Sequence, residues 1–530
     1  MTPSLQARWR DDDGVALVIT LALTLVMTIL VTAVLSSAAT SQRQANHDQD
    51  WQGALAAAEA GIDDYLFRLN RNDAYWRYPA AGPAPDGNTA FAAWTPVPGA
   101  PSEGRFRYTV EASRLASEGV LRLTSSGQVR NATRTIETSL RRSGFLNYLY
   151  FTEFETLDPV AYPTPADRTW ADANCSRHRY SGSGRPTTGR PSSPSEGCLE
   201  INWVTGDTVR GPFHSNDRLL MLGDPVWEGP ASTTSPPPFW VGSGSPQFNG
   251  GALRNAPRLD MPPSNRSIRD QADHTIGSDG CLYTGPTQIR MVNNQLKIKS
   301  PYTKRTGTGC GAFPTTAEVT IPFPTNGVIY VQNIPAASAD ENFTPDCTDQ
   351  GLGYPIAADI APAGAYSCRN GDAFVEGTYD GRLTIASDNN VILTWDVVRA
   401  DDSTTSDDVL GLVANQFVEL YHPVNAGNQN LNALPLHSGK WVNPRIQAAV
   451  LSVNHSFRVQ QWAGGDRDSS LGTINLTGAI AQIYRGPVGT TARTGYLKNY
   501  VYDQRLQYMS PPHFIEAAVS SWNVATWTEL

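Results

Sequence analysis

An uncharged run of apolar and small residues from Val15 to Leu35 limits most strongly what this chain can fold into. At the α-helical rise of ~1.5 Å per residue, a run of this length spans ~31 Å, which matches the hydrocarbon core of a bilayer. Helix-forming sequence continues beyond it, through the alanine-rich stretch 54–60 and on to Phe67. We therefore expect residues 15–35 to be the transmembrane part of a long N-terminal helix that continues outside the membrane.

The basic residues around this run predict its orientation. Arg8 and Arg10 precede it, and the next basic residue is Arg43. Because arginines are kept on the cytoplasmic side, the segment should cross the membrane once, with its N-terminus inside. Two alternatives stay open: a secretory signal peptide cleaved at the small residues 36–39, or a plain single-span anchor.

The stretch DDDGVALVIT at residues 11–20 resembles the type III signal of the type IV pilin superfamily. The resemblance implies that residues 1–14 are a leader, and that a prepilin peptidase cuts between Gly14 and Val15 and leaves the helix on the mature protein. Major subunits of that family carry a glutamate five residues after the cut, where this chain has Ile19. A chain without it is similar to the atypical minor pilins, notably the PilX-like group and the large tip pseudopilins of type II secretion.

Further segments carry the same resemblance. The sequence AAAEAGI at residues 56–62 is similar to the PilX-type N-terminal region. Other matching segments resemble actinobacterial pilus-assembly proteins with a PilX-type start: residues 211–217, 283–287, 371–377, 484–488 and 496–503.

The family implies how the chain would be used. Its partners would be other pilin subunits, the prepilin peptidase and the membrane. It would lie in the bacterial cell membrane before assembly, and then at the cell surface or in an extracellular filament. The side chains expected to pack in the centre of that filament are Val15, Leu17, Val18, Ile19, Leu21 and Leu25.

Composition indicates the class of the remaining chain. At 530 residues the chain is too long for one core, so two or more units are expected. With 45 glycines, 38 prolines and only 17% charged residues, it is typical of a β-rich, loop-rich extracellular protein. The net charge of −9 argues against nucleic acid as a partner. Residues 105–142 nevertheless hold eight arginines against three glutamates, which would form either solvated strand faces or a basic collar that contacts acidic neighbours in a filament.

Six cysteines follow the apolar run, and an even number in an exported chain implies disulfides. They are Cys175, Cys198, Cys281, Cys310, Cys347 and Cys368. Six cysteines allow fifteen pairings, so the sequence does not determine the connectivity. Sequential pairing is favoured because it closes three local loops. The spacing shows no clustered Cys and His ligands, so we expect neither a zinc or redox site nor a cofactor.

Hydrophobic periodicity divides the chain after the transmembrane part. Residues 36–142 should form a pilin-like unit, with a helix ending near Asn70 and a small antiparallel sheet. Residues 143–207 read as an irregular, loop-rich connector, and residues 208–530 as a large β-rich distal domain. The sheet strands are expected at residues 105–112, 120–129 and 133–140.

The distal domain alternates short apolar strands with turns containing Gly, Asn or Asp, which favours a parallel β-helix. A β-sandwich is the alternative, and the hairpin-type turn Asp380-Gly381 speaks for it. The predicted fold class is thus mainly β with a long N-terminal helix. The expected strands include residues 219–222, 318–321, 327–331, 373–376, 383–386, 391–394, 410–414, 417–420, 448–453 and 473–483.

Several residues have side chains that could act as catalytic or metal-binding groups. Glycoside cleavage needs two carboxyl groups ~5–10 Å apart, and acidic residues on neighbouring predicted rungs could supply them, although such carboxylates also cap turn amides. The candidates are Asp372, Glu376, Asp380, Asp388 and Asp396. His214, beside Ser215, Asn216 and Asp217, would be either catalytic or a hydrogen-bonded loop residue. The loop from Asp401 to Asp408 would either hold calcium or be solvated.

These observations predict a non-enzymatic structural subunit of a type IV pilus-like filament. It would be a minor pilin or tip pseudopilin that displays a large β-domain for assembly initiation or adhesion. The alternative is a membrane-anchored surface β-helix protein that binds or cleaves polysaccharide. The ligand of the distal domain, a surface glycan or a host or substrate molecule, stays open, as does metal binding.

Overall fold

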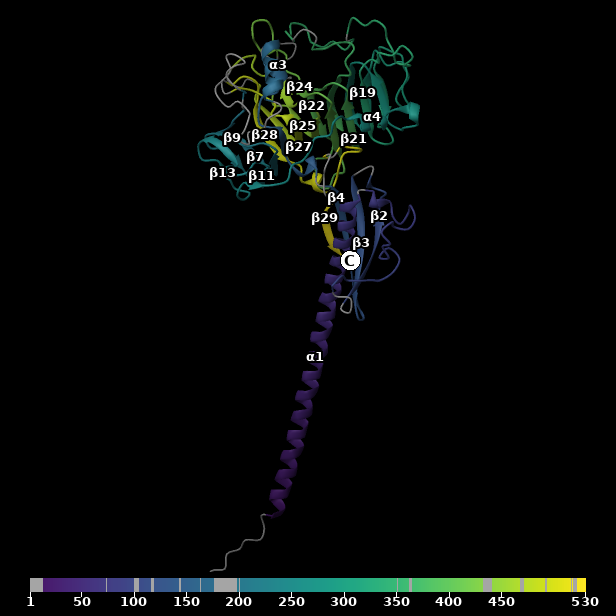
Figure 1. Ribbon diagram of the computed structural model, residues 1–530, viewed down its shortest axis with the longest axis vertical. Coiled ribbons are helices and arrows are strands. Elements are labelled where there is room, and N and C mark those ends of the chain that lie inside the picture. Colours follow the sequence, from purple (N-terminus) through teal and green to yellow (C-terminus); the bar gives the residue numbers. More distant parts are fainter. Residues whose placement is uncertain are drawn as a thin grey trace, which may run out of the picture. The chain divides into compact units, whose positions relative to one another are not determined.

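The computed structural model divides the chain into two compact units (Figure 1). Unit 1 comprises Met1–Glu111, Arg122–Thr138 and Trp527–Leu530, and unit 2 comprises Ala112–Leu121 and Ser139–Thr526. The structure describes residues 13–72, 74–99, 104–115, 119–142, 144–162, 164–175, 198–199, 201–349, 351–361, 365–431, 441–467, 471–490, 493–515, 517 and 522–530.

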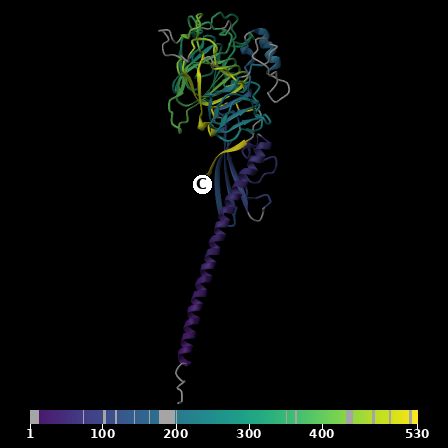
Figure 2. The ribbon, with the colours of Figure 1, turned by 90° about the vertical axis from the view of Figure 1, so that its left-hand side faces the viewer.

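Helix α1, Asp13–Arg71, runs without interruption for 59 residues (Figures 1 and 2). Its end agrees with the predicted end near Asn70. The second half of the helix is amphipathic, because its buried side chains recur at three- and four-residue steps. These buried residues are Ala54, Ala57, Ala58, Ile62, Tyr65 and Leu69. The last turn carries Arg68 and Arg71, whose positive charges suit the negative end of the helix dipole.

Most residues of the small antiparallel sheet belong to unit 1, and the sheet has the strand order β1-β2-β3-β4-β29. Its strands are β1 (Thr95–Pro96), β2 (Arg105–Glu111), β3 (Val120–Val129), β4 (Ala132–Arg142) and β29 (Trp522–Glu529). The amide of Leu530 donates to the Thr135 carbonyl (3.0 Å), and the amide of Ser139 donates to Thr526 Oγ1 (3.2 Å). The end of the chain thus adds a strand to the small sheet, whereas the sequence assigned all of residues 208–530 to a distal domain.

The second half of α1 packs closely on this sheet. Ser125 Oγ on β3 donates a hydrogen bond to the backbone carbonyl of Ala58 (2.8 Å). The rings of Tyr65 and Tyr108 meet edge to face, with their centroids 5.4 Å apart, and the Tyr108 hydroxyl donates to the Asp64 carboxylate (2.9 Å). Apolar burial and a few satisfied polar groups therefore hold the helix to the strands.

Unit 2 is built mainly from short strands in parallel pairs. One ladder stacks ten of them, and each pairs with the next in the same direction. In ladder order these are β14 (Arg254–Asn255), β11 (Ala231–Thr233), β8 (Phe213–Ser215), β5 (Tyr150–Phe154), β27 (Thr473–Tyr484), β25 (Arg445–Ser452), β23 (Val409–Ala414), β21 (Arg382–Ser387), β19 (Val328–Gln332) and β15 (Cys281–Thr284). A column of buried side chains follows the register: Ile329, Ile385, Leu412, Val450, Ile480, Tyr150, Phe213 and Ala231.

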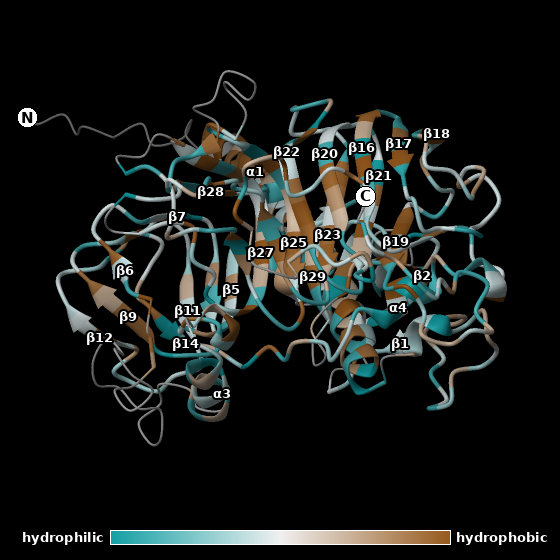
Figure 3. Ribbon diagram, turned by 90° about the horizontal axis from the view of Figure 1, so that it is seen from above, coloured by the Kyte–Doolittle hydropathy of each residue, from teal (hydrophilic) through white to brown (hydrophobic). Residues whose placement is uncertain are grey.

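Two further sets of parallel strands complete unit 2. The second set begins with β16 (Thr287–Asn293), β20 (Ala373–Tyr379), β22 (Val391–Arg399), β24 (Val418–Leu420) and β26 (Phe457–Val459). Strand β22 also pairs with β25, and β27, the neighbour of β25, pairs with β28 (Leu497–Tyr502). From β28 the set continues through β7 (Thr208–Arg210), β10 (Val226–Trp227) and β13 (Gln247–Phe248). The third comprises β6 (Trp203–Val204), β9 (Leu219–Leu222) and β12 (Trp240–Ser243). Figure 3 shows β20, β22 and β25 as largely hydrophobic ribbons, as expected for strands that face a core.

A few elements of unit 2 depart from the parallel arrangement. Strands β17 (Gln295–Lys299) and β18 (Val319–Pro322) extend β16 in antiparallel pairs. Within the described residues, the short helices are η1 (Tyr75–Arg77), η2 (Phe145–Asn147), η3 (Pro159–Ala161), α3 (Pro165–Asn174), α4 (Arg266–Asp270), η4 (His274–Ile276) and η7 (Gln504–Gln507).

The turn Asp380-Gly381 does not close a hairpin. The strand before it, β20, pairs with β16 and β22, and the strand after it, β21, pairs with β19 and β23. Gly381 has a φ of 123°, a conformation that glycine adopts at no steric cost. The turn therefore passes the chain from one ladder to another, and the hairpin interpretation of this dipeptide is wrong.

The region predicted as an irregular connector, 143–207, contains regular structure. It includes β5, which lies in the first ladder between β8 and β27. The hydroxyl of Tyr150 on β5 accepts a hydrogen bond from Gln482 on β27 (2.7 Å), although the two residues are 332 positions apart. The beginning and the end of unit 2 thus meet inside the ladder.

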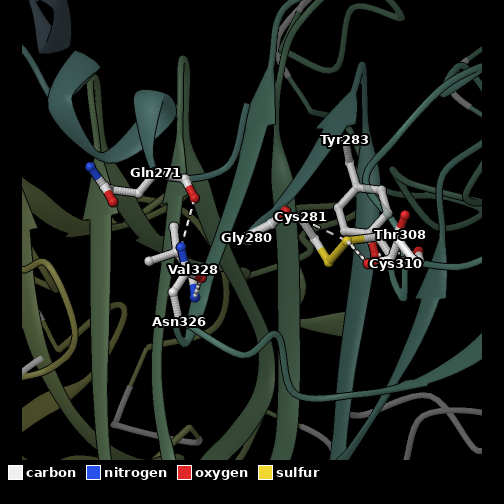
Figure 4. Close-up of a disulfide and its surroundings, with 8 residues drawn as sticks. All are labelled: Gln271, Gly280, Cys281, Tyr283, Thr308, Cys310, Asn326 and Val328. Atoms are coloured by element: carbon white, nitrogen blue, oxygen red, sulfur yellow. Dashed lines mark hydrogen bonds between the residues drawn. A yellow bond between two sulfur atoms is a disulfide. The ribbon is translucent and has the colours of Figure 1, made fainter. Parts of the chain in front are cut away.

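Three disulfides brace unit 2, and they join the cysteines in the sequential order that the sequence favoured. They are Cys175–Cys198, Cys281–Cys310 and Cys347–Cys368. Figure 4 shows the second bond, which ties β15 to the loop before β18. The Tyr283 hydroxyl donates to the Cys310 carbonyl (2.8 Å), so the loop is held at this point by a covalent bond and a hydrogen bond.

Candidate functional site: the N-terminal helix

The first half of α1 presents apolar side chains to its surroundings on every face. The six residues predicted to pack in a filament are between 53% and 64% exposed: Val15, Leu17, Val18, Ile19, Leu21 and Leu25. The helix is long and apolar enough to cross a membrane, and none of its most apolar stretch is buried in the chain. Such a surface is stable only against lipid or other protein.

Hydroxyl side chains interrupt this apolar surface at regular four-residue steps. Each donates a hydrogen bond of 2.6–2.9 Å to a backbone carbonyl three or four residues earlier in the helix. The residues are Thr20, Thr24, Thr28, Thr32, Ser36 and Thr40. Because the helix itself satisfies these donors, they do not prevent it from lying in hydrocarbon.

The exposed apolar half of α1 gives way to the half that packs on the sheet near the middle of the helix. Trp51 is 43% exposed, whereas Ala54 is fully buried against the sheet. Between them, Gly53 lies opposite Val129 of β3, and just before them Asp50 forms an ion pair with Arg130 (3.0 Å). One continuous helix therefore serves as an apolar rod at its start and as part of a soluble core at its end.

The predicted processing site lies at the edge of the described structure. Gly14 falls in the first turn of α1, and Val15 begins its exposed apolar surface. Residues 1–12, most of the predicted leader, lie outside the described residues. The cut between Gly14 and Val15 therefore stays a prediction.

Comparison with known proteins identifies this helix. Residues 13–63 match the model of the PilX N-terminal family. The N-terminal helix is thus type IV pilin-like and PilX-like. The match begins at the first residue of α1 and ends inside its buried half, and it confirms the resemblance predicted for the N-terminal region.

The comparison with solved structures covers most of the chain. One solved structure similar to it is the competence-associated pilin ComZ from Thermus thermophilus, with 12% sequence identity and a TM-score of 0.29, covering 91% of this chain and 98% of that one. No curated protein sequence matches the chain.

The arginines between residues 105 and 142 mostly have partners inside their own unit. Arg105 and Arg107 lie over the ring of Trp94, 5.6 and 4.8 Å from its centroid. Arg134 lies over Trp51 (5.0 Å) and forms an ion pair with Glu529. These contacts favour the interpretation as strand-face residues over that of a free basic collar.

The acidic residues considered for glycan cleavage each have partners of their own or face solvent. Asp372 is buried, and burial raises the pKa of its carboxyl to about 7, while the Asn389 amide donates to it (2.6 Å). Asp388 accepts from the Tyr330 hydroxyl (2.7 Å). The other three do not share a partner. Glu376 accepts a hydrogen bond from Thr394, Asp396 forms an ion pair with Arg445, and Asp380 is exposed to solvent.

His214 is a structural residue of the first ladder. It is fully buried, and its ring nitrogens contact Ser232 Oγ (2.9 Å) and Asn216 Oδ1 (3.1 Å). Burial lowers the pKa of His214 to about 4, so the ring is neutral at neutral pH. This arrangement corresponds to the hydrogen-bonded interpretation of the motif.

The acidic loop after β22 uses its carboxylates locally. Asp401 accepts from the amide of Ser403 (2.8 Å), and Asp408 accepts from the amide of Gly381 (2.6 Å). Asp402 forms an ion pair with Arg399 (3.0 Å). Within the part of the chain that the structure describes, no group of three or more His, Cys, Asp or Glu side chains could hold a metal ion.

Sequence reasoning missed a buried charged cluster at the junction of the two ends of unit 2. Arg485 is only 2% exposed and lies 3.6 Å from the fully buried Glu155. Its guanidinium also lies over the ring of Trp203, 3.7 Å from the centroid, and donates to the Ile201 carbonyl (2.7 Å). Burial raises the pKa of Glu155, which the positive charge of Arg485 opposes. No local pattern signals this cluster, because its members come from distant parts of the chain.

Proposed function

We propose that this PilX-like chain is a non-enzymatic subunit of a type IV pilus-like filament, a minor pilin or tip pseudopilin. The observation that carries the proposal is the unbroken helix α1, with an exposed, uncharged first half and a buried second half. Before assembly, the first half crosses the cell membrane once with its N-terminus inside. In the filament, the same surface packs against the helices of other subunits.

The free energy of moving the helix from the membrane into a filament depends on side-chain packing. In a bilayer the lipid tails are as apolar as the helix surface, so moving into a filament gains little from the hydrophobic effect itself. Van der Waals contact between closely fitting helices then has to stabilise the assembled state. The six exposed residues from Val15 to Leu25 are expected to supply that contact, and Ile19 replaces the glutamate of major subunits with another apolar side chain.

We also propose that unit 2 is a parallel β-helix displayed for assembly initiation or adhesion. Its support is the register: Trp203 pairs with Met221, and Met221 pairs with Gly242, each ~20 residues further on, a spacing typical of stacked repeats. Immunoglobulin-type sandwiches are antiparallel, whereas these pairs are parallel. A domain of this size would clash if it were repeated at every subunit of a filament, which favours the tip.

The first experiment tests processing at Gly14. We expect N-terminal sequencing of the mature protein to read Val-Ala-Leu-Val, and we expect Gly14→Val to leave the precursor uncut. The reason is that peptidase cleavage needs close approach to the backbone, which a branched side chain obstructs. Ala22→Val is the matched control, since it places the same valine side chain within the helix away from the cut.

Two results would contradict the proposal. A mature chain that begins at Met1 would support a membrane-anchored surface protein that binds or cleaves polysaccharide. A mature chain that begins after Ala39 would support a cleaved secretory signal. In either case the helix would not be the element that enters a filament.

A further inference from the structure

A surface cavity of about 640 Å³ lies in unit 2, far in sequence from the helix on which the proposed function rests. Its volume falls within the ~300–1,000 Å³ that small-molecule sites occupy. Two loops form it: residues 300–318, which precede β18, and residues 333–349, which follow β19. The lining residues are Pro301, Tyr302, Lys304, Arg305, Phe313, Pro314, Glu341 and Thr344.

The two loops are fastened to each other beneath the cavity. Asn342 is 1% exposed, and its side-chain oxygen accepts from the amides of Lys304 (2.8 Å) and Arg305 (2.9 Å). Its side-chain nitrogen donates to the Arg305 carbonyl (3.1 Å). Lys304 Nζ donates to the Phe343 carbonyl (2.5 Å), and the Tyr302 hydroxyl donates to the Asp349 carbonyl.

Each loop also carries a disulfide. Cys310 binds Cys281 of β15 (Figure 4), and Cys347 binds Cys368. A site whose walls are fixed before binding spends less free energy on ordering them when a ligand arrives.

The cavity combines positive charge with flat apolar walls. The guanidinium of Arg305 is exposed and has no hydrogen-bond or ion-pair partner among the described residues. To the residues that the structure describes, Lys304 Nζ makes one hydrogen bond, which leaves two of its three donors for a ligand. The single carboxylate in the lining, Glu341, forms an ion pair with His274 Nε2 (2.8 Å). Arginine donates two parallel hydrogen bonds to a carboxylate, which makes it selective for acidic groups.

The walls favour a ring with one apolar face. Tyr302 and Phe313 present aromatic surface, and Pro301 and Pro314 add rigid aliphatic surface. The Phe313 ring is held edge-on against Tyr283, with the centroids 5.7 Å apart. A sugar ring has a C–H face that packs on such surfaces and a polar rim that forms hydrogen bonds with the lysine and arginine.

We propose that this cavity binds an acidic saccharide, with Arg305 and Lys304 taking a sugar carboxylate and the aromatic and proline side chains taking the ring face. The site requires neither leader processing nor filament assembly. Its failure would therefore leave the proposed function untouched, and failure of that function would leave the site in place.

The test is calorimetric titration of the full chain in non-ionic detergent, with tetragalacturonate as the probe and its fully methyl-esterified form as the uncharged control. We expect saturable binding of the acid form that weakens as salt is raised, and no binding of the ester. Arg305→Gln should weaken binding by about tenfold, since it removes a charge-assisted hydrogen bond. Glu341→Gln should strengthen it by about two- to fivefold, since it removes a like charge at an exposed site.

Arg467→Gln is the matched control, because Arg467 is exposed and has no partner among the described residues. It should bind the acid form as the wild-type chain does. The proposal would be overturned by equal binding of the ester, by no binding of either form, or by equal losses in the two arginine variants. Binding of inorganic phosphate that excludes tetragalacturonate would identify a phosphate site and would also overturn it.

Discussion

Gly127 on β3 lies where the sheet of unit 1 approaches α1 most closely, so it offers the sharpest test of how the helix is held. A methyl group at this position would lie 2.2 Å from the Ala54 carbonyl oxygen and 2.2 Å from the Ala58 amide nitrogen. Both are backbone atoms, so no side-chain rotation can relieve the contact. Since nonbonded heavy atoms prefer ~3.5–4 Å, Gly127→Ala must push helix and strand apart by more than ~1 Å.

The size of the effect follows from three contributions. Overpacking of a close contact costs ~1–3 kcal/mol. The separation would also break the hydrogen bond from Ser125 to the Ala58 carbonyl (2.8 Å), which costs a further ~1 kcal/mol. Replacing glycine lowers the conformational entropy of the unfolded chain, which stabilises the folded state by ~0.4–1 kcal/mol. We therefore expect Gly127→Ala to lower the free energy of unfolding of unit 1 by about 2–3 kcal/mol.

The control is Gly53→Ala on the facing helix. Its added methyl group would lie 3.2 Å from Val129 Cγ2, the end of a side chain that can adjust. Alanine is also favoured over glycine by ~1 kcal/mol in a helix interior, so this variant should be neutral or slightly stabilised. Pulse proteolysis with trypsin in urea, read at Arg68 and Arg71 of α1, reports on unit 1. Equal unfolding midpoints for Gly127→Ala and the wild-type chain would refute this account of the interface.

Three further predictions concern stability and the boundaries of the folded units. Replacing both Cys281 and Cys310 by serine should lower the unfolding free energy of unit 2 by about 3–4 kcal/mol, measured by urea denaturation, and an unchanged midpoint would contradict it. Because burial raises the pKa of Asp372 to about 7, its folded state holds a proton that the unfolded chain releases near pH 4, so stability should fall as the pH rises from about 4 to 7. Asp372→Asn should remove that slope in unfolding curves recorded at about pH 5 and about pH 8, and the same slope in the variant would exclude Asp372 as its source. A fragment of residues 43–530 should elute as a soluble monomer in size-exclusion chromatography. A fragment of residues 105–530, which lacks the buried half of α1, should aggregate. If both fragments elute as soluble monomers, the sheet does not need the helix.

Local patterns in the sequence were enough to predict the helix and many of the strands. The 3.6-residue period of Leu55, Ile62 and Leu66 predicted a helix that ends where α1 ends, and two-residue alternation predicted β2, β3 and β4 to within two residues at each end. The predicted strands 219–222 and 410–414 correspond to β9 and β23. These predictions succeed because the buried face of a helix or strand is formed by apolar residues that are only a few positions apart in the sequence.

The tertiary structure alone decided which strands meet. Nothing in residues 522–529 indicates that they join β4, and nothing in residues 150–154 indicates a place between β8 and β27. Backbone hydrogen bonds join such strands, and backbone groups are the same for nearly every residue type. The local sequence of a strand therefore does not indicate which other strand it pairs with. The buried pair of Arg485 and Glu155 follows from the pairing of β5 with β27, and the cavity beside Arg305 follows from the contact of two loops through Asn342. The sequence by itself thus determined the long helix with its apolar first half and many of the strands, while the tertiary structure determined which strands pair and every site built from distant segments.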